Sequence, residues 1–351
     1  MAEGDDIPIY VIDNGSFMTR VGCSYNYNPT SIFPTQIGRP KYKTEKNEKD
    51  IFIGDDCQLK RGLLSINNPI EKGIITNWDD MEILWRYSIN NELRIDPENH
   101  PFLLTETSFN PKINREKSTE IMFEKFKTYV FYIANQSTLS FYSSAFYSKS
   151  STGIILDCGY ERSHIVPIYE GFPIQHNIQS IDFGGKELTD YLMKLLIEKG
   201  YYIDTEIERN TIRNIKEQLC FISQDYQNEI PKNETYQLPD GQTVNIDKER
   251  IQCPEAFFQP SLIDNDCEGI DRLIHKTIMK CDEDIHNDLF KNIVLSGGSS
   301  LFPGMKERIE NEMKKLTSNE TNIKVIAPPE RKHSAWIGGS ILGNLSIFQT
   351  M

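Results

Sequence analysis

Two features of many proteins are missing from this sequence: a long apolar run and closely spaced cysteine pairs. No stretch of about 18 apolar residues occurs, so we expect no membrane-spanning helix. The seven cysteines are scattered without C-x-x-C spacing, which predicts reduced thiols and argues against a disulfide framework. The first residues, MAEGDD, are acidic and have no apolar signal core. We therefore expect a cytoplasmic protein.

Basic residues are scarce relative to acidic ones. The chain has 38 Lys and Arg against 51 Asp and Glu, a formal net charge of −13. This excess of negative charge argues against a nucleic-acid surface and favours a soluble protein with basic or Mg²⁺-bearing partners. With 351 residues, of which 38% are hydrophobic, the chain is long enough for two domains with sizeable cores.

The most informative stretch is residues 152–171, TGIILDCGYERSHIVPIYEG. It predicts two β-strands joined by a tight turn, with Asp157, Gly159 and His164 between the apolar runs. An Asp-x-Gly turn at the end of a strand offers backbone N–H groups to phosphate oxygens and a carboxylate to a cation or its waters. The alternative interpretation of the same residues is an ordinary hairpin turn.

The same pattern occurs a second time, which favours the phosphate-binding interpretation. Residues 7–23, IPIYVIDNGSFMTRVGC, contain an apolar strand, the turn DNGS and a second strand. A third glycine turn follows the apolar strand in residues 293–300, IVLSGGSS. Two strand–Asp-x-Gly–strand units about a domain apart suggest duplicated halves that hold a nucleotide between them.

Periodicity and turn residues predict alternating strands and helices along the rest of the chain. Further strands are expected at residues 31–40, 51–54, 69–78, 101–105 and 323–326, with a hairpin at 236–247. Helices are expected at residues 79–91, 114–126, 137–146, 182–200, 207–224, 269–281, 305–316 and 334–348. Residues 41–50, KYKTEKNEKD, are charged nearly throughout, so we expect an exposed loop there, with or without a function of its own.

Several longer stretches resemble eukaryotic actin, and the resemblance extends over nearly the whole chain. The stretches are GIITNWDDME (73–82), NPKINREK (110–117), IMFEKF (121–126), VPIYEG (166–171), ELTDYLMK (187–194), NIKEQLC (214–220), LPDGQ (238–242), IMKCD (278–282) and APPERKHSAWIGGSIL (327–342). Sugar kinases and heat-shock chaperones share the hairpins with the actin family but not these surface and helix sequences. The resemblance implies an α/β, actin-like (duplicated ribonuclease-H-like) two-domain fold with four subdomains around a nucleotide cleft.

The resemblance also implies domain boundaries. Residues 1–147 and 334–351 would form the small outer domain, with an inserted subdomain at about 36–68. Residues 148–333 would form the large inner domain, with an inserted subdomain at about 184–265. The terminal segment that packs on the small domain in the family would be absent after Met351, which would leave apolar surface for another subunit or partner to cover.

By the same resemblance, the chain would bind ATP or ADP with Mg²⁺ (or Ca²⁺) in the cleft. Asp13 and Asp157 match the two carboxylates that hold the waters of the metal ion. Gln136 and His164 match the residues that orient the attacking water. Phosphoryl hydrolysis needs charge neutralisation and an aligned water more than covalent chemistry. The other positions that match nucleotide contacts are Gly15, Ser16, Arg20, Gly159, Gly185, Lys216, Glu217, Gly297, Gly298 and Lys332.

The family assigns more specific contacts to some of these positions. Ser16 and Arg20 match the serine of the first phosphate loop and its basic residue, which is usually lysine. Lys216 and Glu217 match contacts to the ribose and base side. Lys332 matches a lysine that flanks the base.

Each of these side chains also has a purely structural interpretation. Lys216 and Glu217 are consistent with the solvated charged face of a helix. Gln136 is placed where it would satisfy a helix end, and His164 where it would be a core histidine at the start of a strand.

Three positions of the phosphate loops depart from the family pattern. Phe17 replaces the last glycine of Asp-Asn-Gly-Ser-Gly, at a cost of about 1–2 kcal/mol if its φ must be positive. In the second loop Tyr160 replaces an aspartate that contacts the ribose, and Glu161 replaces a glycine. The Glu161 charge is expected to lie near the triphosphate, partly offset by Arg162. We expect weaker ATP binding, slower hydrolysis, or a site locked on one nucleotide.

The surfaces that the family uses for assembly differ as well. Residues 41–50 take the place of a longer loop with an apolar docking tip, and residues 261–268, SLIDNDCE, replace an apolar plug with an acidic turn. Lys72 stands where the family has a histidine. A few additional residues around positions 145–151 lengthen the connection between the halves.

Two functions from different classes are consistent with these features. The first is a filament-forming or filament-associated cytoskeletal protein, with or without slow ATP hydrolysis. Its partners would be actin or further copies of itself, joined head to tail, and actin-binding proteins. The second is a non-polymerising actin-related scaffold subunit of a larger complex, with static or absent nucleotide. A poorly folding product of a duplicated gene is a third possibility.

Overall fold

The computed structural model describes residues 8–42, 51–201, 206–238, 241–318 and 320–345. Two compact units make up the chain: unit 1 contains residues 1–146 and 333–351, and unit 2 contains residues 147–332. Most of the charged loop expected at residues 41–50 lies outside the described residues.

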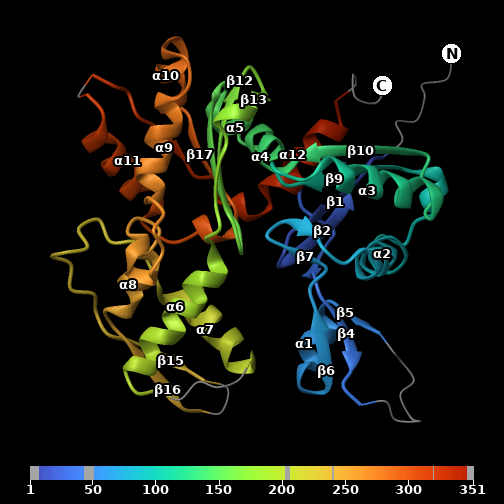
Figure 1. The fold of residues 1–351 in the computed structure, drawn as a ribbon, viewed down its shortest axis with the longest axis horizontal. Helices are drawn as coiled ribbons and strands as arrows, with labels where there is room; N and C mark the ends of the chain where they lie inside the picture. The colour runs from blue at the N-terminus through green and yellow to red at the C-terminus, as the bar shows by residue number, and fades with distance from the viewer. Residues whose placement is uncertain (1–7, 43–50, 202–205, 239–240, 319, 346–351) are drawn as a thin grey trace. The chain divides into compact units, whose positions relative to one another are not determined.

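Unit 1 is built on a five-stranded sheet with the strand order β10-β9-β1-β2-β3 (Figure 1). Its central strand β1 pairs antiparallel with β2 and parallel with β9, which pairs parallel with β10. Val11 and Ile12 of β1 are fully buried, as expected for an apolar run covered on both faces. The bounds are β1 Tyr10–Asn14, β2 Met18–Cys23, β3 Ser31–Pro34, β9 Pro101–Glu106 and β10 Val130–Asn135.

Helix α2 shows why the helices of unit 1 form where they do. The side chain of Asn77 accepts a hydrogen bond from the Asp80 backbone N–H at 3.1 Å and caps the helix. The helix expected at residues 79–91 has an apolar stripe that faces the core, because Met81, Leu84 and Trp85 are fully buried. The bounds are α1 Asp55–Leu59, α2 Trp78–Tyr87, α3 Lys112–Glu124, α4 Gln136–Ser143 and α12 Ser334–Gly343, and α5 Ala145–Ser148 spans the boundary between the units in the sequence.

The strand expected at residues 31–40 is wrong in one respect, because the chain changes sheets in its middle. β3 pairs with β2 in the main sheet, whereas β4 pairs with β5 and β6 in a separate three-stranded sheet. Gly38, Arg39 and Pro40 therefore belong to β4 and not to the main sheet. The bounds are β4 Ile37–Pro40, β5 Phe52–Ile53 and β6 Leu64–Asn67, with the hairpin β7 Ile70–Glu71 and β8 Ile74–Ile75.

Unit 2 contains a second mixed sheet, with the order β13-β12-β11-β17-β18 and with β14 paired to β12. β11 pairs antiparallel with β12 and parallel with β17. The two predicted strand–Asp-x-Gly–strand units are thus both hairpins within a larger sheet. The bounds are β11 Gly153–Cys158, β12 Ser163–Tyr169, β13 Phe172–Pro173, β14 Gln179–Ile181, β17 Ile293–Ser296 and β18 Val325–Ile326, with the hairpin β15 Glu234–Gln237 and β16 Thr243–Ile246.

In unit 2, α6, α7, α8 and the β15–β16 hairpin lie together at one end (Figure 1). At the start of α6 the backbone N–H of Gly184 donates to the Glu187 carboxylate at 2.9 Å. The apolar side of this helix is buried through Leu188, Leu192, Leu195 and Leu196. Gly200, expected to end α6, has a φ of +101°. The helices are α6 Gly185–Glu198, α7 Glu206–Leu219, α8 Glu249–Glu255, α9 Ile270–Met279, α10 Glu283–Phe290 and α11 Met305–Leu316.

Several elements were missed or misplaced by the sequence patterns. Strand β10 and helices α8 and α10 were not predicted. The helix expected at residues 137–146 is divided between α4 and α5, and that expected at 334–348 ends at Gly343. α2 continues as a π-helical turn, Ser88–Leu93. Among the described residues, no helix is both long and apolar enough to cross a membrane.

Candidate functional site

Asp13 is the centre of a polar cluster in unit 1. The register of β1 beside β9, and the start of α4, bring Thr105 and Gln136 to it. Asp13 Oδ1 accepts hydrogen bonds from Thr105 Oγ1 at 2.7 Å and from Gln136 Nε2 at 3.0 Å. Asp13 Oδ2 accepts one from an Arg20 terminal nitrogen at 3.2 Å. These partners compensate for the burial of a carboxylate that is only 3% exposed.

Gln136 is the first residue of α4, but it does not cap that helix. The neighbouring Asn135 side chain accepts from the backbone N–H groups of Ser137 and Thr138 and supplies the cap. The Gln136 amide nitrogen instead donates toward Asp13, Thr105 and the Asn14 carbonyl oxygen. Its side chain is therefore held beside the first loop.

The turn after β1 holds its shape through contacts with two other segments. The Ser16 hydroxyl oxygen accepts from the Gly73 backbone N–H at 2.9 Å. Thr35 donates its hydroxyl to the Gly15 carbonyl oxygen at 2.7 Å and its backbone N–H to the Phe17 carbonyl oxygen at 3.0 Å. Phe17 is not among the described non-glycine residues with positive φ, so the strain considered for it does not arise.

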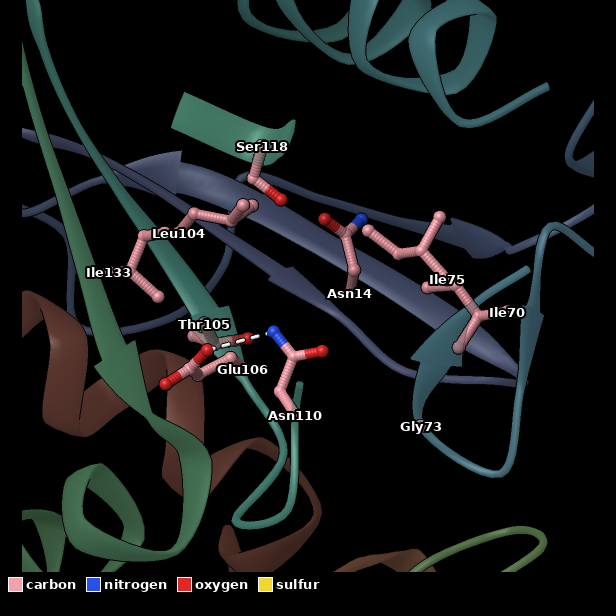
Figure 2. A pocket seen from close by; sticks show the side chains of 10 residues that line it. All are labelled: Asn14, Ile70, Gly73, Ile75, Leu104, Thr105, Glu106, Asn110, Ser118 and Ile133. Carbon is pink, nitrogen blue, oxygen red and sulfur yellow. Dashed lines mark hydrogen bonds between the residues drawn. The ribbon is translucent and has the colours of Figure 1, made fainter. Parts of the chain in front are cut away.

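A small cavity lies next to this loop in unit 1 (Figure 2). Its volume is about 20 Å³, which is enough for a single water molecule and far too little for a nucleotide. Polar side chains that line it include Asn14, Thr105 and Asn110, and Asn110 Nδ2 donates to Glu106 at 2.9 Å. This cavity is therefore suited to an ordered water beside the Asp13 cluster.

In unit 2 the β11–β12 turn is defined mainly by its backbone. Gly159 N–H donates to the Arg162 carbonyl oxygen at 3.0 Å, and a Cβ on Gly159 would lie 2.7 Å from that oxygen. The amides at the start of α6 donate to the turn, from Gly185 to the Gly159 oxygen at 3.1 Å and from Lys186 to the Tyr160 oxygen at 2.7 Å. The tight turn and the helix N-terminus therefore hold each other in place.

The two charged residues of this turn, Glu161 and Arg162, form ion pairs with residues that the sequence analysis did not identify as their partners. Lys186 Nζ lies 3.0 Å from Glu161 Oε1, and this hydrogen bond raises the pKa of Lys186. Arg162, which was expected to offset part of the Glu161 charge, donates from its Nε to Asp182 at 2.7 Å. The ion pair of Glu161 is therefore with α6.

The third glycine turn contacts the second loop. β17 lies parallel to β11, with Ser296 beside Asp157. Gly297 has a φ of +82°, and a Cβ there would lie 2.2 Å from the Cys158 carbonyl oxygen and 2.7 Å from Asp157 Oδ1. Only glycine is compatible with this geometry. A Cβ on Gly298, by contrast, would meet no atom within 4 Å.

His164 lies opposite Asp157 on the β11–β12 ladder, so both side chains project from the same face. It is 7% exposed, and burial, followed by the positive charge of Arg162, lowers the pKa of His164 to about 4. The imidazole is therefore neutral near pH 7 and suited to accept a proton or a hydrogen bond.

The remaining predicted contacts differ in their surroundings. Lys216 is buried and donates to the Gly185 carbonyl oxygen at 2.6 Å and to Thr189 Oγ1 at 2.9 Å, and burial lowers its pKa. Glu217 is exposed and lies 3.9 Å from Arg213. Lys332 is exposed. The solvated-face interpretation therefore suits Glu217 but not Lys216.

Three residues were missed, two in contact with the predicted set and one in contact with Glu161. Thr105 and Lys186 contact Asp13 and Glu161, and His333 Nδ1 accepts from Arg20 Nε at 3.0 Å. Thr105 could have been identified from the sequence as a candidate site residue, because it lies at the carboxyl end of a predicted strand. Lys186 and His333 are identified only by tertiary contacts.

The donor chemistry fits a nucleotide with a divalent cation. Asp13 and Asp157 are hard oxygen donors near the ends of β1 and β11, next to tight glycine turns. In the described part of the chain, no group of three or more His, Cys, Asp or Glu side chains is arranged to hold a metal ion. Each carboxylate, taken in its own unit, suits a cation such as Mg²⁺, which keeps several waters and needs only one or two carboxylates.

A comparison with protein families agrees with this geometry. The family model described as Actin matches residues 4–351, nearly the whole chain. The match includes both hairpins and the third glycine turn.

Proposed function

Because this chain belongs to the actin family, we propose that it binds ATP or ADP with Mg²⁺ (or Ca²⁺) through the loops of both units. Members of the family generally bind an adenine nucleotide and a divalent cation. The observation that carries the proposal is that the strand-end carboxylates Asp13 and Asp157 occur in the same setting in each unit, beside a tight glycine turn. That setting is suited to phosphate oxygens and a hydrated cation.

Two departures from the family pattern do not count against nucleotide binding. Phe17 takes an ordinary backbone conformation, so the first loop does not need a glycine there. Glu161 is paired with Lys186, so its charge is compensated before any phosphate approaches. Neither substitution therefore argues against a site that retains affinity for nucleotide.

We propose that each unit contributes some of the contacts to the nucleotide and its cation. In unit 1 we assign Asp13 to the cation side and Gly15, Ser16 and Arg20 to the phosphate side. In unit 2 we assign Asp157 to the cation side and Gly159 to the phosphates. When bound, the cation would neutralise part of the phosphate charge. The further contacts proposed in unit 2 are Gly185, Lys216, Glu217, Gly297, Gly298 and Lys332.

Slow hydrolysis would depend on two side chains of this chain. The Gln136 amide nitrogen faces Asp13, which leaves its oxygen as the group suited to accept from an attacking water. Neutral His164 would accept a proton or hydrogen bond from the same water. We propose this as an arrangement for alignment and proton handling, and not for covalent chemistry.

We further propose a cytoskeletal role in the cytoplasm, with actin or further copies of this chain as head-to-tail partners and with actin-binding proteins as additional partners. The second candidate is a non-polymerising scaffold subunit with static or absent nucleotide. The ion pair between Arg20 and Asp13 favours it, since it balances the charge of the first loop without a cation.

Calorimetry of the full chain with ATP and Mg²⁺ tests the proposal. We expect a dissociation constant near or below the micromolar range and a raised melting temperature for the bound protein. Asp157→Asn should weaken this affinity by at least about tenfold, because it removes a carboxylate from the cation side. A folded chain that does not bind at millimolar nucleotide would leave the scaffold function. Co-sedimentation with actin filaments then separates the two roles.

A further inference from the structure

Arg20 contacts two residues of unit 1 that are far apart in the sequence. One of its terminal nitrogens lies 3.2 Å from Asp13 Oδ2, and its Nε donates to His333 Nδ1 at 3.0 Å. Its side chain is 16% exposed and that of Asp13 is 5% exposed. The guanidinium is therefore held by both partners in a largely buried position.

The geometry of these contacts suits arginine and not lysine. Arg20 uses one edge of its rigid planar fork for Asp13 and its Nε for His333. A lysine ammonium carries its three N–H donors on one nitrogen, so it does not offer two donor nitrogens spaced apart in a rigid plane. Arg20 and His333 therefore form a paired feature of this chain.

The contacts of Asp13 show that its charge is already balanced. Oδ2 faces Arg20, while Oδ1 accepts from Thr105 and Gln136. The guanidinium supplies one positive charge, which matches the single negative charge of the carboxylate. A cation that approaches Asp13 meets this positive charge at close range, and the repulsion is strong where water is largely excluded.

We propose that Arg20, oriented by His333, is a built-in counter-ion of Asp13 that competes with a divalent cation for this carboxylate. In this role Arg20 is a positioning residue, because it acts through Asp13, in addition to the phosphate side assigned to it above. The inference deepens the proposed function, since it concerns how that same site depends on metal. It makes the first loop stable with or without a cation.

The experiment is thermal melting of the full chain without added nucleotide, in EDTA and in excess Mg²⁺ or Ca²⁺. We expect the unaltered protein to melt within about 2 °C in the two conditions. Arg20→Met leaves Asp13 without its counter-ion, so it should melt at least roughly 5 °C lower in EDTA and regain much of that loss with the cation. This difference in cation response is a readout that a merely structural role of Arg20 would not produce.

His333 provides variants that leave both charges in place. His333→Phe removes the acceptor for Arg20 Nε but keeps a planar ring, and it should increase the melting shift caused by the cation. His333→Asn keeps a hydrogen-bond acceptor at a similar position and should behave like the unaltered protein. These two variants, together with Arg20→Lys, keep the proposal testable if Arg20→Met does not fold.

The proposal is overturned if the unaltered protein gains as much from the cation as Arg20→Met does. It is also overturned if His333→Phe and His333→Asn respond alike. Failure of the proposed function is a different result, namely that no nucleotide binds in calorimetry to a folded chain. The melting comparison remains decisive in that case because it needs no nucleotide.

Discussion

The first loop of unit 1 and the second loop of unit 2 are similar in sequence pattern but are held in different ways. Around Asp13, side chains from three other segments make the contacts, through Arg20, Thr105 and Gln136. Around Gly159, backbone groups make most of them, through the turn itself and the first amides of α6. One loop depends on its side chains and the other on its backbone.

This difference explains how each loop accommodates its departures from the family pattern. In the first loop, Arg20 in place of lysine and Phe17 in place of glycine alter the contacts without a positive φ. In the second loop the backbone has little freedom, so the added charge of Glu161 is balanced from outside the loop, by Lys186. The variants below test this contrast, beginning with the largest expected effect.

Gly297→Ala tests whether the stability of unit 2 depends on the close approach of the Gly297 and Cys158 backbones. Its φ of +82° and the 2.2 Å distance from a new Cβ to the Cys158 oxygen predict a loss of at least about 3 kcal/mol in unfolding free energy. Gly298→Ala is the matched control, because a Cβ there meets no atom within 4 Å. Chemical denaturation of both variants checks this, and equal stabilities would contradict it.

The buried His164 predicts a pH dependence of stability. Its pKa is about 4 in the folded protein, so between about pH 6.5 and 4 the unfolded chain binds a proton that the folded chain does not. Stability should therefore fall as the pH falls through this window, by up to about 3 kcal/mol. Urea denaturation from neutral to acidic pH measures the slope.

His164→Gln is the comparison for this slope. It removes the titrating group and should flatten the curve across the same window, while His275, whose pKa is also lowered by burial, stays in place. If the two proteins lose stability in parallel as the pH falls, His164 is not the group responsible.

Lys186→Met tests the external charge balance of the second loop. Glu161 is 11% exposed and Lys186 is 39% exposed, so the loss should be only about 1 kcal/mol. Combining it with Glu161→Gln should restore most of this loss, because no unpaired charge then remains. Lys194→Met, at an exposed position on the same helix, is the control. Denaturation of the unaltered protein, the single variants Lys186→Met and Glu161→Gln, and the double variant gives the coupling energy, and a value near zero would refute the pairing.

Phe17→Gly is expected to have the smallest effect. Since Phe17 does not use a positive φ, a glycine brings no relief of strain and costs at most about 1 kcal/mol of stability. ATP affinity should change by less than roughly threefold in calorimetry. A large gain in affinity would mean that the ring, and not the backbone, limits nucleotide binding.

The two hairpins and the third glycine turn were predicted well because their signals are local. An apolar run that ends on Asp-x-Gly forms a strand and a turn from neighbouring residues alone. β10 was missed because it is an edge strand whose exposed positions carry Val130 and Tyr132, so its pattern lacks polar alternation. The break between β3 and β4 was missed because each half pairs with a different sheet.

The order of residues determined the α/β class, the family, and the positions of Asp13 and Asp157 at strand ends, since these follow from short-range periodicity and long matching stretches. Only the tertiary structure determined which charged side chains contact one another. Glu161 pairs with Lys186, the adjacent Arg162 pairs with Asp182, and Arg20 contacts His333 more than 300 residues away. The physical reason is that ion pairing depends on distance in space, which folding sets and separation along the chain does not reveal.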